Sequence, residues 1–138
     1  MKEAQSKQVL RVLDANLNRL KEGLRVCEDT ARFVLNDKRS TGELKKIRHE
    51  IASCVQALGY KKLAQARDVL SDVGAKDSAG EYAREKVPDV LIANAQRCKE
   101  SIRVLEEYAK LFDNSSAKKL KRARYAFYTI EKRILKKI

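Results

Sequence analysis

The sequence predicts an all-α protein: a four-helix bundle built from two repeated helical hairpins, with short extra helices in the connector. The composition favours helices, because Leu, Ala, Lys, Arg and Glu are abundant while the chain has one Pro and five Gly. Apolar residues recur at the three- and four-residue spacing of a helix with one buried face. The stretch 13–36 returns 78 residues later as 91–114, with 11 of 24 positions identical. Two such hairpins are expected to bury their apolar faces against one another.

The first hairpin is expected to begin with a long helix over residues 6–36. After a polar break, the run Ser40–Glu43 resembles a capping box, in which the Ser40 or Thr41 hydroxyl caps the second helix and Glu43 reaches back. Gly59 is placed to end that helix in the left-handed conformation. The expected buried faces are Leu10, Leu13, Leu17, Leu20, Leu24, Cys27, Ala31 and Leu35, followed by Leu44, Ile47, Ile51, Cys54 and Leu58.

The second hairpin, about 88–138, repeats the first, about 9–59, so that residues 1–138 are expected to form one helical domain. Pro88 suits the first turn of its first helix, where a missing amide hydrogen costs nothing. The second helix returns at an offset of 76 residues. Its expected buried face is Leu120, Ala123, Phe127, Ile130 and Ile134.

The connector over residues 60–87 has no counterpart elsewhere in the chain. Its first part, 60–70, is predicted to form a short helix. One or two further helical turns are expected to run to Lys86, capped by Asp77 or by Ser78 with Glu81. Such a long connector can carry functional residues, because its side chains are not constrained by packing in the core of the bundle.

The chain is strongly basic, with a formal net charge of +12 and a pI near 9.8. Such a surface attracts nucleic acid or phosphorylated ligands, although a plain solvated face has the same composition. Nine of the cations lie in 115–138, against one acid. The three cysteines form no CxxC pair and are expected to pack in the core of a cytoplasmic protein. No apolar run approaches the ~20 residues of a membrane span, so no membrane partner is expected.

Several polar residues are identical in the two copies. Arg25 and Arg103 lie opposite the buried face and suit an exposed ladder, with Arg25 pairing Glu22 and Asp29. Others border the apolar face, where a polar group needs partners. They either form structural networks at the bundle ends or line a ligand site. This second group is Asn16, Arg19, Asn94 and Arg97.

The connector contains a second group of candidates. Asp68 and Asp72, four residues apart beside Arg67, could hold Mg²⁺ bridged to phosphate oxygens. Turn and helix capping is the alternative. In the last helix, Tyr125 lies among cations such as Arg124 and could stack on bases. No phosphate-loop, dinucleotide, zinc-protease or nucleophile-elbow motif occurs, so no catalytic residue is assigned.

Four phrases in order, LDANLNRLKEGLRVCED, ARDVLSDVG, ANAQRCKESIRVLEEYAK and RYAFYTIEKRI, resemble the all-helical domain found N-terminal to the barrel of some bacterial thiamine-phosphate synthases. The resemblance covers about Val9 to Leu135 and implies a role in thiamine biosynthesis. The synthase reaction belongs to the β/α barrel, which cannot fit in 138 residues. The chain is therefore not expected to be the synthase by itself, and no catalytic residue is carried over.

The leading hypothesis is a domain associated with thiamine-phosphate synthase that binds a phosphorylated pyrimidine or thiazole intermediate, with Mg²⁺ as a possible companion, or docks to the synthase barrel. The alternative is a basic interaction module that binds RNA through Lys118 to Lys137. It could instead bind a protein or a second copy through a thin apolar line with Val26, Phe33, Val104 and Leu111. The candidate ligand-binding residues are Asn16, Arg19, Glu22, Arg67, Asp68, Asp72, Asn94, Arg97, Glu100, Arg124 and Tyr125.

Overall fold

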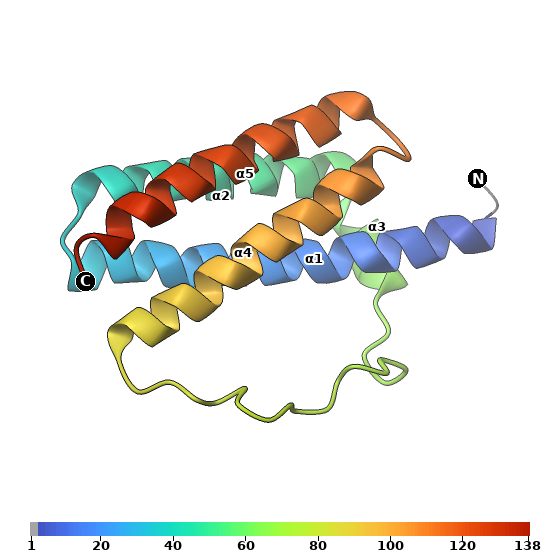
Figure 1. The fold of residues 1–138 in the computed structure, drawn as a ribbon. Coiled ribbons are helices and arrows are strands. Elements are labelled where there is room, and N and C mark those ends of the chain that lie inside the picture. Colours follow the sequence, from blue (N-terminus) through green and yellow to red (C-terminus); the bar gives the residue numbers. More distant parts are fainter. Residues whose placement is uncertain (1–2) are drawn as a thin grey trace.

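The computed structural model describes residues 3–138, with side chains from residue 6 onward, and its elements are helices. Along the chain they are α1 (Glu3–Asp29), the π-helical turn η1 (Thr30–Val34), α2 (Lys38–Leu58), α3 (Tyr60–Ala66), α4 (Val87–Ala109) and α5 (Asn114–Leu135) (Figure 1). The predicted all-α class is confirmed. Within this described part, no helix combines the length and the apolar character that crossing a membrane requires.

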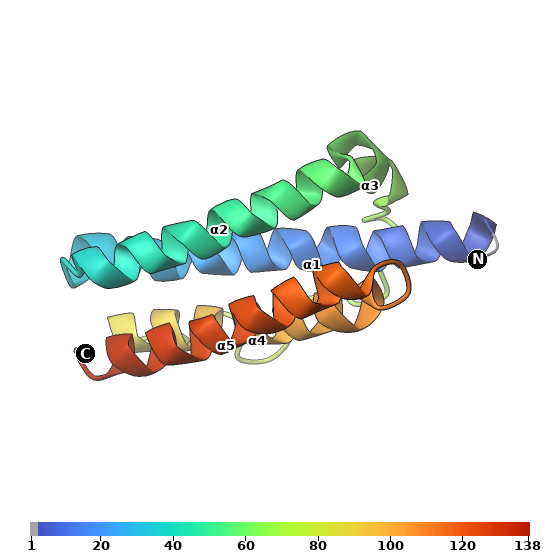
Figure 2. The same cartoon turned by 90° about the horizontal axis from the view of Figure 1, so that it is seen from above.

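The four long helices form a bundle in which neighbours run in opposite directions. α1 and α4 lie side by side in the middle, and α2 and α5 lie above them in Figure 1. Figure 2 shows the same arrangement from above, with α2 beside α1 and α5 over α4. The connector between α3 and α4 crosses the molecule on the side of α1 and α4 that faces away from α2 and α5. The bundle therefore has two different faces.

The core consists of the predicted apolar faces. All of the expected residues of α1 up to Ala31, and all of those of α5, are buried. The end of α2 differs, because Cys54 and Leu58 are only partly buried. The most enclosed large side chains are Leu20, Leu24, Leu44, Ile51, Leu63, Ile102, Leu105, Phe127 and Ile134.

The two hairpins approach each other closely at Gly23 of α1. A Cβ atom at this position would lie 2.8 Å from Cys98 Sγ and 3.1 Å from the Asn94 carbonyl oxygen of α4. Any larger residue would therefore push the two helices apart. The repeat places Ser101, another small and buried residue, at the equivalent position of α4. Small residues on both sides set the crossing of α1 and α4.

The start of α2 corrects the predicted capping box. The helix begins at Lys38 with Asp37 as its cap, and Asp37 Oδ1 accepts from the Ser40 amide at 3.0 Å. The Ser40 hydroxyl donates to Asp37 Oδ2 at 2.6 Å, and Ser40 lies inside α2 and not at its cap. Asp37 is the better cap for α2, because its carboxylate has two acceptor oxygens whereas a serine hydroxyl has one. Asp113 caps α5 in the same way, accepting from Ser115 and Ser116.

The other predicted element ends are partly confirmed. Gly59 ends α2 with a φ of 89°, and Pro88 lies in the first turn of α4. The predicted helix over 60–70 ends at Ala66, because Arg67 turns to extended backbone and pairs with α1. The predicted turns of helix before Lys86 are wrong: the Glu81 carboxylate accepts from the Ser78 amide, but residues 79–82 form non-helical turns and no helix forms between Ala66 and Val87.

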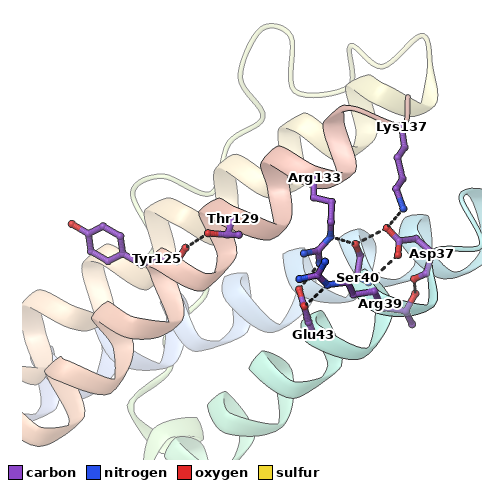
Figure 3. A network of polar contacts seen from close by, with 9 residues as sticks. Asp37, Arg39, Ser40, Glu43, Tyr125, Thr129, Arg133 and Lys137 are labelled. Carbon is purple, nitrogen blue, oxygen red and sulfur yellow. Dashed lines mark hydrogen bonds and ion pairs between the residues drawn. The ribbon is translucent and has the colours of Figure 1, made fainter.

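A polar network joins the end of α5 to the start of α2 (Figure 3). Arg133 Nε donates to Ser40 Oγ at 3.1 Å, and its guanidinium pairs with Glu43. Lys137 Nζ lies 2.8 Å from Oδ2 of Asp37, which is buried. Burial alone raises the pKa of Asp37, but hydrogen bonds from Lys137 and Ser40 outweigh it and hold this pKa below its ordinary value. The network therefore fastens the two hairpins at one end of the bundle.

Asp37→Asn should destabilise the protein at neutral pH by roughly 1–2 kcal/mol, because Asn keeps the cap but loses the charge that meets Lys137. The folded state depresses the carboxyl pKa, so this stabilisation is present above the unfolded value of about 4 and is lost as pH falls below it. Urea unfolding at pH 7, 5 and 3 should show the difference from wild type shrinking at pH 3. An unchanged difference would contradict the role of the charge.

Gly23→Ala should destabilise by about 1–2 kcal/mol, because overpacking against Cys98 and Asn94 outweighs the gain in helix propensity of up to ~1 kcal/mol. Gly42, within α2, is the matched control, since a Cβ there would have no neighbour within 4 Å. Gly42→Ala should therefore stabilise by about 0.5–1 kcal/mol. Thermal unfolding of both variants tests the packing of α4 against Gly23. Equal shifts of the two melting temperatures in the same direction would contradict it.

Candidate functional site

Four charged side chains lie beside the crossing of α1 and α4. Glu22 precedes Gly23, and Arg19 lies about one turn earlier on the same flank of α1. Arg97 and Glu100 hold the same positions relative to Ser101 on α4. All four are exposed, and the helical period directs them away from α2 and α5. We call these four residues the double-arginine face.

The double-arginine face is free of internal ion pairs. Within residues 6–138, Glu22, Arg97 and Glu100 form no side-chain hydrogen bond, and Arg19 reaches only Asn16 Oδ1, at 3.5 Å. The predicted ladder between Glu22 and Arg25 does not form, because Arg25 turns instead to Glu28, at 3.7 Å. The charges of this face are left to solvent or to a ligand.

Two asparagines flank this face inside the α1–α4 interface. Asn16 is 5% exposed, and its amide nitrogen donates to the Val12 carbonyl at 2.9 Å. Asn94 is partly buried and donates to the Val90 carbonyl at 2.8 Å. Both amides thus tie back to their own helix in the same way. The amide oxygens of Asn16 and Asn94 are the atoms that could accept a hydrogen bond from a ligand.

The start of the connector is fixed to α1 by two arginines. Arg67 makes a bidentate pair with buried Asp14, with contacts of 2.7 and 2.9 Å, and the pair raises the pKa of Arg67. Arg11 Nη2 donates to the Asp68 carbonyl oxygen at 2.6 Å. Sequence reasoning missed Asp14, whose partner lies 53 residues away along the chain. Only the tertiary fold brings the two together.

Asp68 and Asp72 both act within turns of the connector. Asp68 Oδ1 accepts from the Ser71 amide at 3.1 Å, and hydrogen bonds from Ser71 lower the pKa of Asp68. Asp72 Oδ1 accepts from the Gly74 amide at 2.9 Å. Across the described residues, no three acidic, His or Cys side chains come close enough to hold a metal ion. The structure thus shows the capping role, and Mg²⁺ binding stays a prediction.

Arg124 and Tyr125 lie on α5, in a different part of the molecule. Arg124 pairs with Glu106 of α4, which is 3% exposed, through contacts of 2.9 and 3.4 Å. Hydrogen bonds from the arginine to Glu106 and Tyr128 raise its pKa. Tyr125 is exposed, with the Arg124 guanidinium 5.2 Å from its ring centroid. Arg124 is thus used inside its own hairpin.

The first hairpin contains the same buried pair. Arg48 meets Glu28 through contacts of 2.8 and 3.4 Å, and Glu28 is 2% exposed. Burial raises the pKa of Glu28, but the hydrogen bond and the charge of Arg48 outweigh this effect. The pKa of Glu28 therefore lies below its ordinary value. The repeated glutamates therefore lock α1 to α2 and α4 to α5.

A groove of about 1090 Å³ lies between α2 and α5. None of the eleven candidate residues lines it. The signal that could have found it is the expected buried face of α2, whose last members, Cys54 and Leu58, line the groove and are only partly buried. The helical period thus directs Arg19, Glu22, Arg97 and Glu100 away from α2 and α5, whereas the groove lies between those two helices.

Fold and site together define a class: an all-α bundle of two related hairpins that carries an exposed arginine and an exposed glutamate at the same positions of both central helices. The ThiD2 family model matches residues 11–133, and the chain belongs to this family. It is 40% identical to a thiamine-phosphate synthase of Rhodopirellula baltica over 93% of this chain and 34% of that protein. It is also 40% identical to a thiamine-phosphate synthase of Nostoc punctiforme over 97% of this chain and 37% of that protein.

The match covers the N-terminal part of these relatives, so the chain spans about a third of their length. A third relative, the thiamine-phosphate synthase of Synechocystis, is 40% identical over 98% of this chain and 38% of that protein. No solved structure matches the chain significantly. The chain is thus a helical domain of the kind associated with thiamine-phosphate synthases, as the resemblance implied.

Arg124→Ala should destabilise the protein by about 3 kcal/mol or more, because it leaves the Glu106 carboxylate buried without its main partner. Arg103 also contacts Glu106, at 3.3 Å, but its side chain is 54% exposed. Arg103→Ala should therefore cost ~0.5 kcal/mol or less. Chemical denaturation of both variants provides the comparison. Similar losses would mean that Arg124 serves something other than the hairpin.

Proposed function

We propose that this domain binds a phosphorylated pyrimidine or thiazole intermediate of thiamine phosphate formation on the double-arginine face. One observation carries the proposal. Arg19 and Arg97 occupy equivalent places in the two hairpins, both are exposed beside the crossing, and neither has a carboxylate partner within residues 6–138. Other arginines at repeated positions, such as Arg25 and Arg103, are paired with glutamates.

The chemistry of the face suits a phosphate attached to a polar ring. A guanidinium donates two parallel hydrogen bonds to phosphate oxygens, and two arginines from opposite helices can grip one group from both sides. The Asn16 and Asn94 oxygens lie next to these arginines in the interface and can accept from N–H groups at the edge of a heterocycle. Phosphate and ring are thus recognised by different atoms.

The carboxylates of Glu22 and Glu100 set a condition on this site. They form no ion pair with the two arginines, but they bring the formal charge of the four residues to zero and would repel a bare phosphate. A divalent ion such as Mg²⁺, bridging carboxylate and phosphate oxygens, would convert this repulsion into attraction. In this proposal Arg67, Asp68 and Asp72 shape the connector near the site, and Arg67 acts through Asp14 as a positioning residue.

Titration of the full chain with a phosphorylated aminopyrimidine and a phosphorylated thiazole, each with and without Mg²⁺, tests the proposal. Binding should raise the melting temperature, since a ligand at 100 times its Kd adds about 2.7 kcal/mol. Replacing both Arg19 and Arg97 by Ala should weaken binding by about a hundredfold, at roughly tenfold for each charge-assisted contact.

The matched control replaces Arg25 and Arg103 by Ala, which removes the same charge from the same helices. This pair of changes should leave affinity within about twofold of wild type, because rim charges that pair elsewhere contribute little. The absence of any thermal shift at millimolar ligand would contradict the proposal. An equal loss of affinity in both double variants would show that net charge alone attracts the ligand.

A further inference from the structure

The groove between α2 and α5 is a long apolar trough. Along α2 its lining runs from Arg39 to Leu58, which corresponds to about 28 Å of helix. The opposite wall runs along α5 as far as Arg133. Its floor comes from all four long helices and consists mainly of Leu13, Leu17, Ile47, Ile51, Leu105 and Ile130.

The size and walls of the groove fit a helix better than a small heterocycle. A length of ~28 Å matches a helix of five turns, whereas a phosphorylated ring would fill only a fraction of about 1090 Å³. The walls carry short side chains, including Ser53 and Ala57 on α2 and Ala126 on α5. Short side chains allow another helix to approach to the usual 8–10 Å between axes.

The rim of the groove is positively charged. Lys46, Lys119 and Arg122 line it, are exposed, and form no ion pair among residues 6–138. Within the described part of the chain, three acids also line the groove: Glu43 pairs with Arg39 and Arg133, Asp113 caps α5, and Glu50 alone is left against the three unpaired cations. An apolar floor with a cationic rim is complementary to an amphipathic helix flanked by acidic residues. A second copy of this chain, at +12, would meet like charge.

We infer that this groove receives an acidic amphipathic helix from the part of a thiamine-phosphate synthase that lies beyond the matched third. This inference rests on the proposed association with the synthase and is independent of ligand binding on the double-arginine face. In the relatives, the matched part and the remaining two thirds share one chain, which holds them at a high effective concentration toward one another. A surface through which the helical part meets the rest is therefore expected.

Isothermal titration of the full chain with an intact thiamine-phosphate synthase that carries no helical domain of its own tests the inference. Binding should weaken as salt increases, because the rim charges steer it. Ala57→Glu on α2 and Ala126→Glu on α5 should each weaken binding by about tenfold or more, since each puts a bulky negative group in the groove. Both positions are exposed, so the fold tolerates the change.

The matched control is Ala52→Glu, the same change on an exposed position of α2 that does not line the groove. It should leave the affinity within twofold of wild type, and so should the double replacement of Arg19 and Arg97. No binding, or equal weakening by all three glutamates, would overturn the inference. Light scattering that shows a dimer disrupted by Ala57→Glu would assign the groove to a second copy instead and would also overturn it.

Discussion

The close approach of α1 and α4 at Gly23 is the constraint on which the rest of the structure depends. With no side chain at that position, the backbone of α4 comes within contact distance of α1 at Asn94 and Cys98. Each hairpin buries a face that its own two helices cannot cover, so the hairpins must meet here. Because α1 and α4 fill the middle of the bundle, α2 and α5 are carried to its flank, where their apolar faces close only in part. One contact thus determines both outer faces.

The charges of the bundle divide into three sets with different physical consequences. Glu28 and Glu106 are buried, and each contacts one arginine of its own helix and one of the neighbouring helix, so they hold each hairpin together. Leaving either carboxylate buried and unpaired would cost a large amount of free energy. The Asp37–Lys137 pair is not repeated among residues 6–138: Asp113 and Lys61 hold the equivalent positions, but Asp113 caps α5 by accepting from Ser115 and Ser116. The double-arginine face has neither burial nor pairing. Of these three sets, only the last is available without breaking a structural contact; the groove-rim cations Lys46, Lys119 and Arg122 are likewise unpaired among residues 6–138.

The long helices and their pairing into hairpins could be predicted because residues close together in the sequence determine them. The apolar spacing located the long helices, and the repeat predicted that they form two hairpins. The capping box failed because Asp37, three residues earlier, can also cap a helix, and composition alone does not show at which residue the helix begins. The ion pair of Arg67 with Asp14 could not be predicted from the sequence, because the residues around each of them do not specify a partner 53 positions away. Grooves are harder still, because periodicity shows which face is apolar and not how completely it closes.

The two outer faces share the same two central helices, which connects their proposed functions. Leu13 and Leu17 form the floor of the groove, while Asn16 and Arg19, between and just beyond them in sequence, belong to the other side of α1. A helix seated in the groove presses on one side of α1, and a ligand on the double-arginine face contacts the other side. If seating the helix changes the α1–α4 crossing even slightly, it changes the spacing of Arg19 and Arg97. Any such coupling must be reciprocal, so a ligand that favours one crossing favours docking to the same extent.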